Sequence, residues 1–403
     1  MTLIEFFSSS HVDNIAASLR LQPEKLVMVG DADEMSVPVK RYQKLLSQRG
    51  LRTKISTCNV QEKDFGEICA VLRKLVDQEP DCVIDLTGGD ELTIMAVGAA
   101  VSNLDQNARN HIRVERFDHE KDCVVDCIHG NQNLSCKPAN LTVEELIALH
   151  GGTLHPDSYQ PPVDFTHRDL DTLWDLVSDA PKEWNNSLMI LGEFESRSDS
   201  KTEIYLPLRF LRNSISDFDR KEGIVRDLLD KLQRRGIIDD RSSRDVLEYT
   251  YLDPVQRYCI QKAGNVLEVK TLLEGRSVLE DGRPFFHDCR MSVSIDWDGV
   301  VHKSYEKEPE TRNEIDVILM HGTTPLFISC KNGTIADDEP YKLDTVAARF
   351  GGPYVKKMLV AADPTAVNRA LGQRIQDMGI RPVTNVTEMS HAEWRQALIQ
   401  AMQ

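Results

Sequence analysis

Residues 313–332 carry polar side chains in two stretches that otherwise have the composition of buried strands. Glu314 and Asp316 are two positions apart in the first stretch, and Ser329 and Lys331 are two apart in the second. Because residues two apart on a strand share a face, each pair is expected to project together. Carboxylates, a hydroxyl and a lysine on one face of a hairpin can hold a divalent cation and polarise a water molecule.

The apolar residues of the same hairpin alternate with this polar set. Ile315, Val317, Leu319, Ile328 and Cys330 are therefore expected to point the other way, into a core. The pattern of acid, gap, serine and lysine also arises by chance in ordinary core strands with polar edges. That alternative stays open on the spacing alone.

A second candidate site lies near the N-terminus, where Gly88 and Gly89 follow an apolar strand and precede a helical pattern. Glycines let the backbone turn sharply and approach a ligand closely. The helix that follows offers free N–H groups and the positive end of its dipole, which favour phosphate. Thr87 adds a hydroxyl, and Asp90 follows the glycines.

A similar loop, residues 8–11, follows the first apolar stretch and reads Ser-Ser-Ser-His. In an open α/β sheet, ligands bind beyond the carboxyl ends of the strands, at the point where strand order reverses. Either loop alone also fits an ordinary capped turn between a strand and a helix. Together the two loops favour a ligand site.

Strand and helix patterns alternate over the first hundred residues. The expected strands are 3–7, 26–29, 54–56 and 82–86, and the expected helices are 11–21, 37–46, 65–76 and 92–101. This alternation predicts an α/β fold with a parallel sheet and helices on both faces. Residues 113–128 predict an added antiparallel hairpin.

The composition changes near His150, where glycines and prolines mark a boundary. The next segment is predicted to be mostly helical, with an apolar stripe over 224–232 that Gly236 closes. A winged helix is the alternative for this segment, although no basic recognition helix follows. A mixed α/β pattern then returns. The predicted division is 1–150, 151–255 and 256–403.

The whole-chain composition limits the class of protein. A length of 403 residues with 41% hydrophobic residues indicates two or three globular domains. No long apolar run and no basic N-terminal region are present, so neither a membrane span nor a signal peptide is expected. Nine cysteines, an odd number, favour reduced thiols and a cytoplasmic location. A net charge of −16 argues against a protein that coats nucleic acid, but it permits a nuclease.

Cys123, Cys127, His129 and Cys136 form a second group of possible metal ligands. Their spacing is irregular, and the first two lie in a strand-like pattern. Buried reduced thiols are therefore favoured over a zinc site.

The serine-rich loop and the Thr87-Gly88-Gly89 loop resemble those of the CARF domain, the sensor of CRISPR-associated accessory proteins. That family is a Rossmann-like homodimer that binds cyclic oligoadenylate across its two-fold axis. The resemblance implies a homodimer and a cyclic oligoadenylate held by Ser8, Ser9, Ser10, His11, Thr87, Gly88, Gly89 and Asp90. The family commonly has Thr-Lys after the glycines, whereas this chain has Asp90 and Glu91, which leaves the ring size open.

The 313–332 hairpin resembles the PD-(D/E)xK, or restriction-endonuclease-like, nuclease core. Asp316 matches the motif aspartate and Lys331 the motif lysine, and Glu268 matches a glutamate on the preceding helix. Ser329 stands where an acid is expected, which removes a metal ligand that Glu314 or Glu268 could replace. The resemblance implies Mg²⁺ or Mn²⁺ at Asp316, Glu268, Glu314 and the backbone carbonyl of Cys330, with Lys331 orienting the attacking water.

The order of sensor, helical middle and nuclease resembles CRISPR ancillary nucleases activated by cyclic tetra-adenylate. It implies a metal-dependent endonuclease that cleaves DNA and/or RNA in type III CRISPR antiviral defence, with no membrane partner. Two alternatives stay open. One is a ligand-gated nucleic-acid-binding regulator, and the other is a binding-only sensor whose nuclease domain is degenerate, which Ser329 makes plausible.

Overall fold

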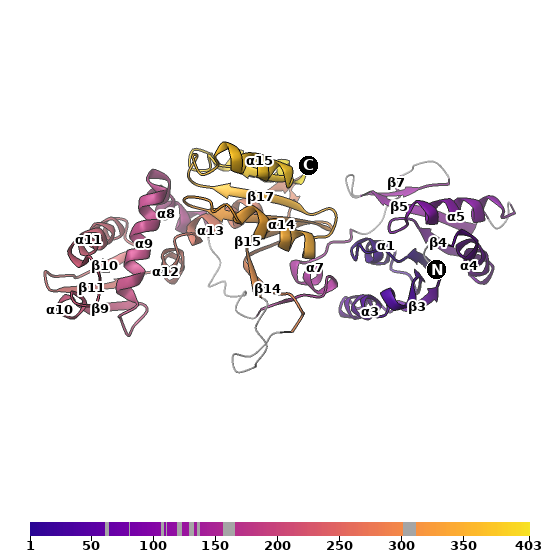
Figure 1. The fold of residues 1–403 in the computed structure, drawn as a ribbon, viewed down its shortest axis with the longest axis horizontal. Helices are drawn as coiled ribbons and strands as arrows, with labels where there is room; N and C mark the ends of the chain where they lie inside the picture. The colour runs from indigo at the N-terminus through magenta and orange to yellow at the C-terminus, as the bar shows by residue number, and fades with distance from the viewer. Residues whose placement is uncertain are drawn as a thin grey trace.

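The computed structural model describes residues 1–60, 64–79, 81–105, 109, 111–118, 123–128, 133–134, 138–155, 166–300 and 312–403. Figure 1 shows three units in a row along the long axis of the molecule. The N-terminal α/β unit and the segment from α8 (His167–Asp179) to α11 (Phe218–Arg234) lie at opposite ends, and the C-terminal sheet lies between them. The order of the units in space therefore differs from their order in the sequence.

The N-terminal unit is built on a seven-stranded sheet in the order β3-β2-β1-β4-β5-β6-β7. Its strands are β1 (Thr2–Phe6), β2 (Lys25–Gly30), β3 (Lys54–Asn59), β4 (Cys82–Asp85), β5 (Ile112–Asp118), β6 (Cys123–Asp126) and β7 (Asn133–Leu134). The first five strands in sequence pair in parallel, and β5, β6 and β7 pair antiparallel. The predicted parallel sheet with an added antiparallel hairpin is confirmed, and the strand order reverses between β1 and β4.

Helices cover both faces of this sheet, as the alternating pattern predicts. They are α1 (Asp13–Leu21), α2 (Ala32–Met35), α3 (Pro38–Gln48), α4 (Phe65–Gln78) and α5 (Glu91–Ser102). Side chains of α1 and α3 share a core with Leu3 and Met28, whereas those of α4 and α5 share one with Ile4 and Val27. Adjacent residues of β1 and β2 thus point to opposite cores, because side chains alternate along a strand.

The middle unit contains helices and a small sheet. Its elements are α8 (His167–Asp179), α9 (Pro181–Glu195), β9 (Glu203–Pro207), α10 (Leu208–Leu211), α11 (Phe218–Arg234), β10 (Ile238–Asp240) and β11 (Val246–Tyr251). The strands pair antiparallel in the order β10-β11-β9. From α9 onward, this order of helices and strands is that of a winged helix. Gly236 follows α11 with a φ of 68°, as expected of the residue that closes a helix.

The C-terminal unit has a six-stranded sheet in the order β18-β17-β16-β15-β14-β8. Its strands are β8 (Thr153–Leu154), β14 (Asp288–Asp296), β15 (Arg312–His321), β16 (Thr324–Lys331), β17 (Lys356–Ala361) and β18 (Ile380–Val383), with a separate hairpin of β12 (Leu279–Glu280) and β13 (Arg283–Pro284). Its helices are α12 (Pro254–Gln261), α13 (Asn265–Arg276), α14 (Glu339–Phe350), α15 (Arg369–Asp377) and α16 (His391–Met402). β8 pairs with β14, so residues just after the predicted boundary at 150 join this sheet.

The two faces of the C-terminal sheet belong to two different cores. α13 and α16 cover one face, and their core continues into the middle unit. α14, α15 and α7 (Val143–Leu149) cover the other face, and their core continues into α1 and α3 of the N-terminal unit. The sheet is therefore packed between the other two units.

The prediction of a single buried face on the 313–332 hairpin is partly wrong. Val317, Leu319, Ile328 and Cys330 share one core, as expected. Ile315 instead packs into the core on the opposite face. The alternation changes because regular pairing of β15 with its neighbours is interrupted between residues 315 and 317.

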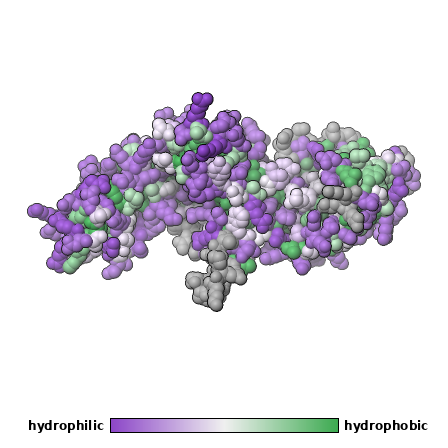
Figure 2. Space-filling model, in the orientation of Figure 1, coloured by the Kyte–Doolittle hydropathy of each residue, from purple (hydrophilic) through white to green (hydrophobic). Residues whose placement is uncertain are grey.

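Figure 2 shows one face of the molecule, which is mostly hydrophilic with small apolar patches. Two large apolar side chains of α5, Ile94 and Met95, are 44% and 64% exposed. Within the part of the chain that the structure describes, no helix combines the length and the hydropathy that a bilayer crossing requires.

Candidate active site and ligand-binding loops

Asp316 lies at the point in the C-terminal sheet where the regular pairing of β15 with its neighbouring strands is interrupted. Pairing between β15 and β16 runs from the turn to the pair Val317–Ile328 and stops one residue short of Asp316. On β14, Ser292 lies between the partners of Val317 and Ile315, and its φ of 48° is in the left-handed region. Such strain in a residue other than glycine is retained where the surrounding structure enforces it, often at functional sites. The distortion leaves the Asp316 carboxylate available to groups at the strand ends.

The polar residues predicted on the two strands do converge. The Asp316 Oδ2 atom accepts a hydrogen bond from the Cys330 backbone N–H at 2.6 Å and lies 3.2 Å from Ser329 Oγ. Lys331 Nζ lies 3.4 Å from the same oxygen. Burial acts to lower the pKa of Lys331, but the neighbouring carboxylates, Asp316 first among them, outweigh it and raise the pKa above its usual value. The lysine is therefore a permanent cation at this site.

Glu268 approaches the site from α13, the helix that packs against one face of the C-terminal sheet. Its Oε2 atom accepts a hydrogen bond from Ser292 Oγ at 3.1 Å. Burial, and then the charge of Asp316, raise the pKa of Glu268 to about 8, with a smaller contribution from Glu314. A carboxyl group that resists ionisation beside other acids indicates surplus negative charge, which a divalent cation would relieve. The donor set therefore fits the oxygen ligands that Mg²⁺ and Mn²⁺ prefer.

The remaining predicted residues of this site differ in position. Glu314 is exposed, although its charge still acts on Glu268. Cys330 is buried, and its Sγ atom lies 3.6 Å from Thr271 Oγ1 of α13. The Cys330 side chain therefore belongs to the core, and its main chain forms part of the site through the bond to Asp316.

The sequence interpretation missed Glu339, the first residue of α14. Its Oε1 atom accepts a hydrogen bond from Ser329 Oγ at 2.9 Å and lies 2.9 Å from Lys331 Nζ. An acid in the first turn of a helix is common, because it complements the helix dipole. The spacing of eight positions from Lys331 therefore gave no distinctive signal in the sequence.

The two loops predicted to bind a ligand lie side by side, because β1 and β4 are neighbours in the sheet. A Cβ atom added to Gly88 would lie 2.7 Å from the Phe6 carbonyl oxygen and 3.2 Å from Ser8 Cβ. Only glycine permits this close approach of the loops. Their predicted role in binding a ligand remains a prediction.

Side chains of the first loop differ in their partners. Ser8 Oγ accepts a hydrogen bond from the Ser10 backbone N–H at 2.9 Å, and Ser9 is exposed. The buried Ser10 Oγ atom has no hydrogen-bond partner among the described residues. His11 Nδ1 lies 2.7 Å from the Tyr42 hydroxyl. Ser10 thus provides an unused hydroxyl at the predicted ligand site.

In the second loop, two of the predicted residues are engaged within the protein. Thr87 Oγ1 donates to Asp85 Oδ1 at 2.6 Å and accepts from the Phe117 N–H at 2.9 Å. Asp90 Oδ1 accepts from the Thr93 N–H at 2.7 Å and so caps α5. These bonds shape the loop and turn the Asp90 carboxylate toward its own helix.

Buried acids form a row beneath these loops. Glu5, Asp85, Glu115 and Asp126 face one another in register across β1, β4, β5 and β6. Burial, partly offset by hydrogen bonds from Thr87, raises the pKa of Asp85 to about 7, and the charge of Glu115 adds to the rise. Burial, with the charge of Asp85, also raises the pKa of Glu5 well above its usual value. Glu5 and Asp85 therefore keep their protons to a higher pH than exposed carboxyl groups do.

A cluster of metal-ligand types occurs elsewhere, at His167, Glu274 and His391. The Glu274 carboxylate already lies 2.9 Å from Arg395 Nε and 3.7 Å from Lys270 Nζ. Two cations on one carboxylate make a third, divalent one unfavourable, so the geometry indicates a buried ion-pair cluster. For the zinc alternative, His129 and Cys136 lie outside the described residues.

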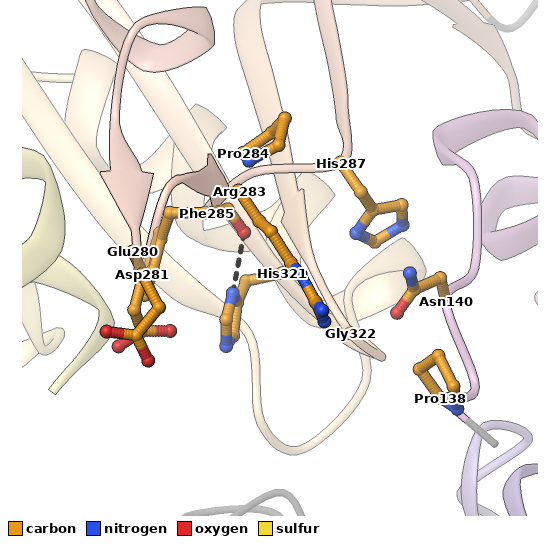
Figure 3. A pocket seen from close by; sticks show the side chains of 10 residues that line it. All are labelled: Pro138, Asn140, Glu280, Asp281, Arg283, Pro284, Phe285, His287, His321 and Gly322. Carbon is orange, nitrogen blue, oxygen red and sulfur yellow. Dashed lines mark hydrogen bonds between the residues drawn. The ribbon is translucent and has the colours of Figure 1, made fainter.

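A further pocket lies apart from both sites (Figure 3). It is lined by Pro138, Asn140, Glu280, Asp281, Arg283, Pro284, Phe285, His287, His321 and Gly322. The His321 ring stacks on Phe285 with centroids 4.1 Å apart, and its Nδ1 atom lies 2.7 Å from the Phe285 carbonyl oxygen. None of these lining residues was predicted to be functional, so the pocket gives no support to either site.

Comparison with known proteins agrees with the geometry of the C-terminal unit. Residues 263–397 match the family model of the Card1-like endonuclease domain. The match begins just before α13 and ends within α16, so it includes Glu268, Asp316 and Lys331. No curated protein matches the sequence.

Solved structures share the fold of the whole chain. Protein VC1899 from Vibrio cholerae has a TM-score of 0.72 and 15% identity, covering 99% of this chain and 97% of its own. Can2 from Sulfobacillus thermosulfidooxidans, solved in complex with cyclic tetra-adenylate, has a TM-score of 0.66 and 16% identity, covering 100% and 97%. A type III CRISPR defence DNA nuclease activated by cyclic oligoadenylate is a weaker likeness, with a TM-score of 0.47, 15% identity, and coverage of 90% and 45%.

The chain therefore shares the fold of VC1899 and Can2 over nearly its whole length. Its C-terminal unit matches the Card1-like endonuclease domain over residues 263–397. The resemblance inferred from the sequence is confirmed as a domain match for the C-terminal unit and as a shared fold for the whole chain.

The buried acid row predicts a pH-dependent stability. Asp85 has a raised pKa in the folded protein, so its contribution to stability is lost as pH rises from about 4 to about 7. Asp85→Asn cannot ionise, and we expect it to be more stable than wild type at pH 8, by up to about 4 kcal/mol. The difference should shrink toward pH 4. Thermal melting over this pH range measures it, with the exposed Asp77→Asn as control. Parallel curves for wild type and Asp85→Asn would contradict the assignment.

Proposed function

We propose that the protein is a cyclic oligoadenylate-activated, metal-dependent endonuclease that cleaves DNA and/or RNA in type III CRISPR antiviral defence. The observation that carries this proposal is the convergence of Asp316, Ser329 and Lys331 beside Glu268 within a Card1-like endonuclease domain. The shared fold with Can2, whose structure contains cyclic tetra-adenylate, supports that ring as the activator.

Mg²⁺ or Mn²⁺ is the proposed cofactor, held by Asp316 and Glu268 with Glu314 and the Cys330 carbonyl nearby. Such an ion supplies charge neutralisation at the phosphate and lowers the pKa of a bound water. The Lys331 ammonium, fixed by carboxylates, would position the attacking water and stabilise charge that develops on the phosphate oxygens.

The proposed activator site lies at the paired loops of the N-terminal unit. Backbone N–H groups at the start of α5 and the unused Ser10 hydroxyl offer hydrogen bonds to phosphate. A homodimer is proposed as the binding unit. In support, α5 exposes Ile94 and Met95 beside small residues on an otherwise apolar helix, which is typical of a helix that packs against a partner.

Helix α14 connects the two proposed sites. Its first residue, Glu339, contacts Ser329 and Lys331. At its other end the chain reaches His150, because a Cβ atom on Gly352 would lie 3.5 Å from His150 Nε2. The rings of His150 and His11 are 5.3 Å apart. A ligand that displaces the loop of His11 can therefore shift α14, a rod of 12 residues or about 18 Å.

Burial and nearby positive groups keep the imidazole of His11, at the N-terminal end of this connection, uncharged. Burial first, then the neighbouring His150, Arg41 and Arg349, lower the pKa of His11 to about 4. His11 is therefore a neutral imidazole near pH 7. A phosphate of the activator would enter a region where Arg41 and Arg349 supply positive potential, which favours its binding.

The activity is tested by cleavage of labelled DNA and RNA with Mn²⁺, with and without cyclic tetra-adenylate. Wild type should cut in a ligand-stimulated manner. Asp316→Ala should lose the activity, and Lys331→Ala should reduce it by roughly 100-fold because it removes stabilisation of developing charge. Stimulated cutting that survives both substitutions would reject the site.

The connection through α14 predicts a variant with impaired regulation. Arg349→Ala removes a charge that acts on His11 without touching the active-site residues. We expect basal cleavage to persist and the ratio of ligand-stimulated to basal cleavage to fall by roughly fivefold or more. The exposed Arg369→Ala on α15 is the matched control and should keep the wild-type ratio. An unchanged ratio in Arg349→Ala would show that this end of α14 carries no signal.

A ligand-gated regulator remains the second candidate, because the middle unit has winged-helix order. Its α11 is a weak recognition surface, since Arg226 and Arg234 are paired with Glu222 and Asp230. Ligand-dependent DNA binding without cleavage, unaffected by Asp316→Ala, would favour this candidate.

A further inference from the structure

We propose that Glu339 supplies the acidic metal ligand that Ser329 cannot supply. The carboxylate would thus have moved from the end of β16 to the first turn of α14. This inference rests on the proposed nuclease function and assigns a role to a residue that the motif does not contain.

The contacts of Glu339 bring its carboxylate close to position 329, where the nuclease motif has its second acid. Ser329 Oγ lies 2.9 Å from Glu339 Oε1 and 3.2 Å from Asp316 Oδ2, so the hydroxyl stands between the two carboxylates. Lys331 Nζ lies 2.9 Å from the same Glu339 oxygen. A longer acidic side chain at 329 would extend toward the space that the Glu339 carboxylate now holds. The short side chain of Ser329 therefore leaves space that the Glu339 carboxylate, at the start of α14, occupies.

The helix holds Glu339 in a defined place. Pro340 follows it in the first turn and fixes the backbone there. Leu343, Val346 and Phe350 anchor the helix in the core beneath the sheet. The Glu339 side chain is only 18% exposed. A ligand on a packed helix is better preorganised than one on a loop.

The replacements expected from the sequence fit less well. Glu314 is exposed on β15, and Glu268 lies on the α13 side of the sheet, bonded to Ser292. Glu339 shares both the hydroxyl and the ammonium with Asp316, so these two carboxylates face one region. One lysine there meets two close carboxylates, which leaves negative charge for a cation to neutralise.

The test uses Mn²⁺ binding by calorimetry on the full-length protein, together with cleavage. Glu339→Gln keeps the size of the side chain and removes its charge. We expect it to weaken Mn²⁺ binding by about tenfold or more and to reduce cleavage. The double variant Ser329→Glu with Glu339→Gln returns a carboxylate to β16 and should recover both properties in part.

A merely structural role for Glu339 makes a different prediction. If it only holds Lys331, Glu339→Gln leaves Mn²⁺ affinity unchanged and Ser329→Glu does not rescue cleavage, and either result overturns the proposal. Asp338→Asn, the exposed acid directly before Glu339, is the matched control and should bind Mn²⁺ like wild type.

The failure of this proposal is distinguishable from failure of the nuclease assignment. A wild-type protein that neither binds Mn²⁺ nor cuts nucleic acid rejects the proposed function itself. A wild-type protein that does both, with a Glu339→Gln variant that equals it, rejects only the role of Glu339. Melting curves confirm that each variant is folded, and the double variant decides the outcome if Glu339→Gln alone is unstable.

Discussion

The proposed active site depends on one interruption of the C-terminal sheet, at Asp316. On one side, β15 stops pairing with β16, and on the other, Ser292 of β14 adopts a left-handed backbone. A fully paired strand would direct its side chains alternately into the two cores that cover this sheet. The interruption instead leaves a carboxylate at the strand ends, where it accepts the Cys330 N–H and meets Ser329 and Lys331.

This opening lies between two cores, and each contributes one acid. Glu268 comes from α13, whose core continues into the middle unit, and Glu339 comes from α14, whose core continues into the N-terminal unit. In the proposed mechanism, a change in the packing of the N-terminal unit would reach the site through α14, because a packed helix moves as a body rather than deforming. Glu268, on α13, lies outside this connection. Its position therefore depends on packing against the middle unit, whereas that of Glu339 depends on packing against the N-terminal unit.

Local patterns predicted what depends on local sequence. The parallel sheet, the two loops and the convergence of Asp316 with Lys331 follow from strand periodicity and motif spacing. Glu339, the reversed orientation of Ile315 and the pairing of β8 with β14 could not be predicted. Each of these depends on contacts between segments that the spacing does not connect. The sheet in the middle unit was missed because its strands are short, with three to six residues each.

In the absence of a metal cation, the Lys331 ammonium partly neutralises the carboxylates of the site. The ammonium contacts both Asp316 and Glu339, so it neutralises part of the charge that would otherwise repel the two carboxylates. At the proposed metal site, a divalent cation would have to compete with this ammonium for the same oxygens, so its occupancy would depend on where Glu339 lies. A shift of α14 toward or away from β16 would change that competition directly. The helix that leads toward the loops of the N-terminal unit thus begins at Glu339, the carboxylate whose position sets the charge balance around Asp316 and Lys331.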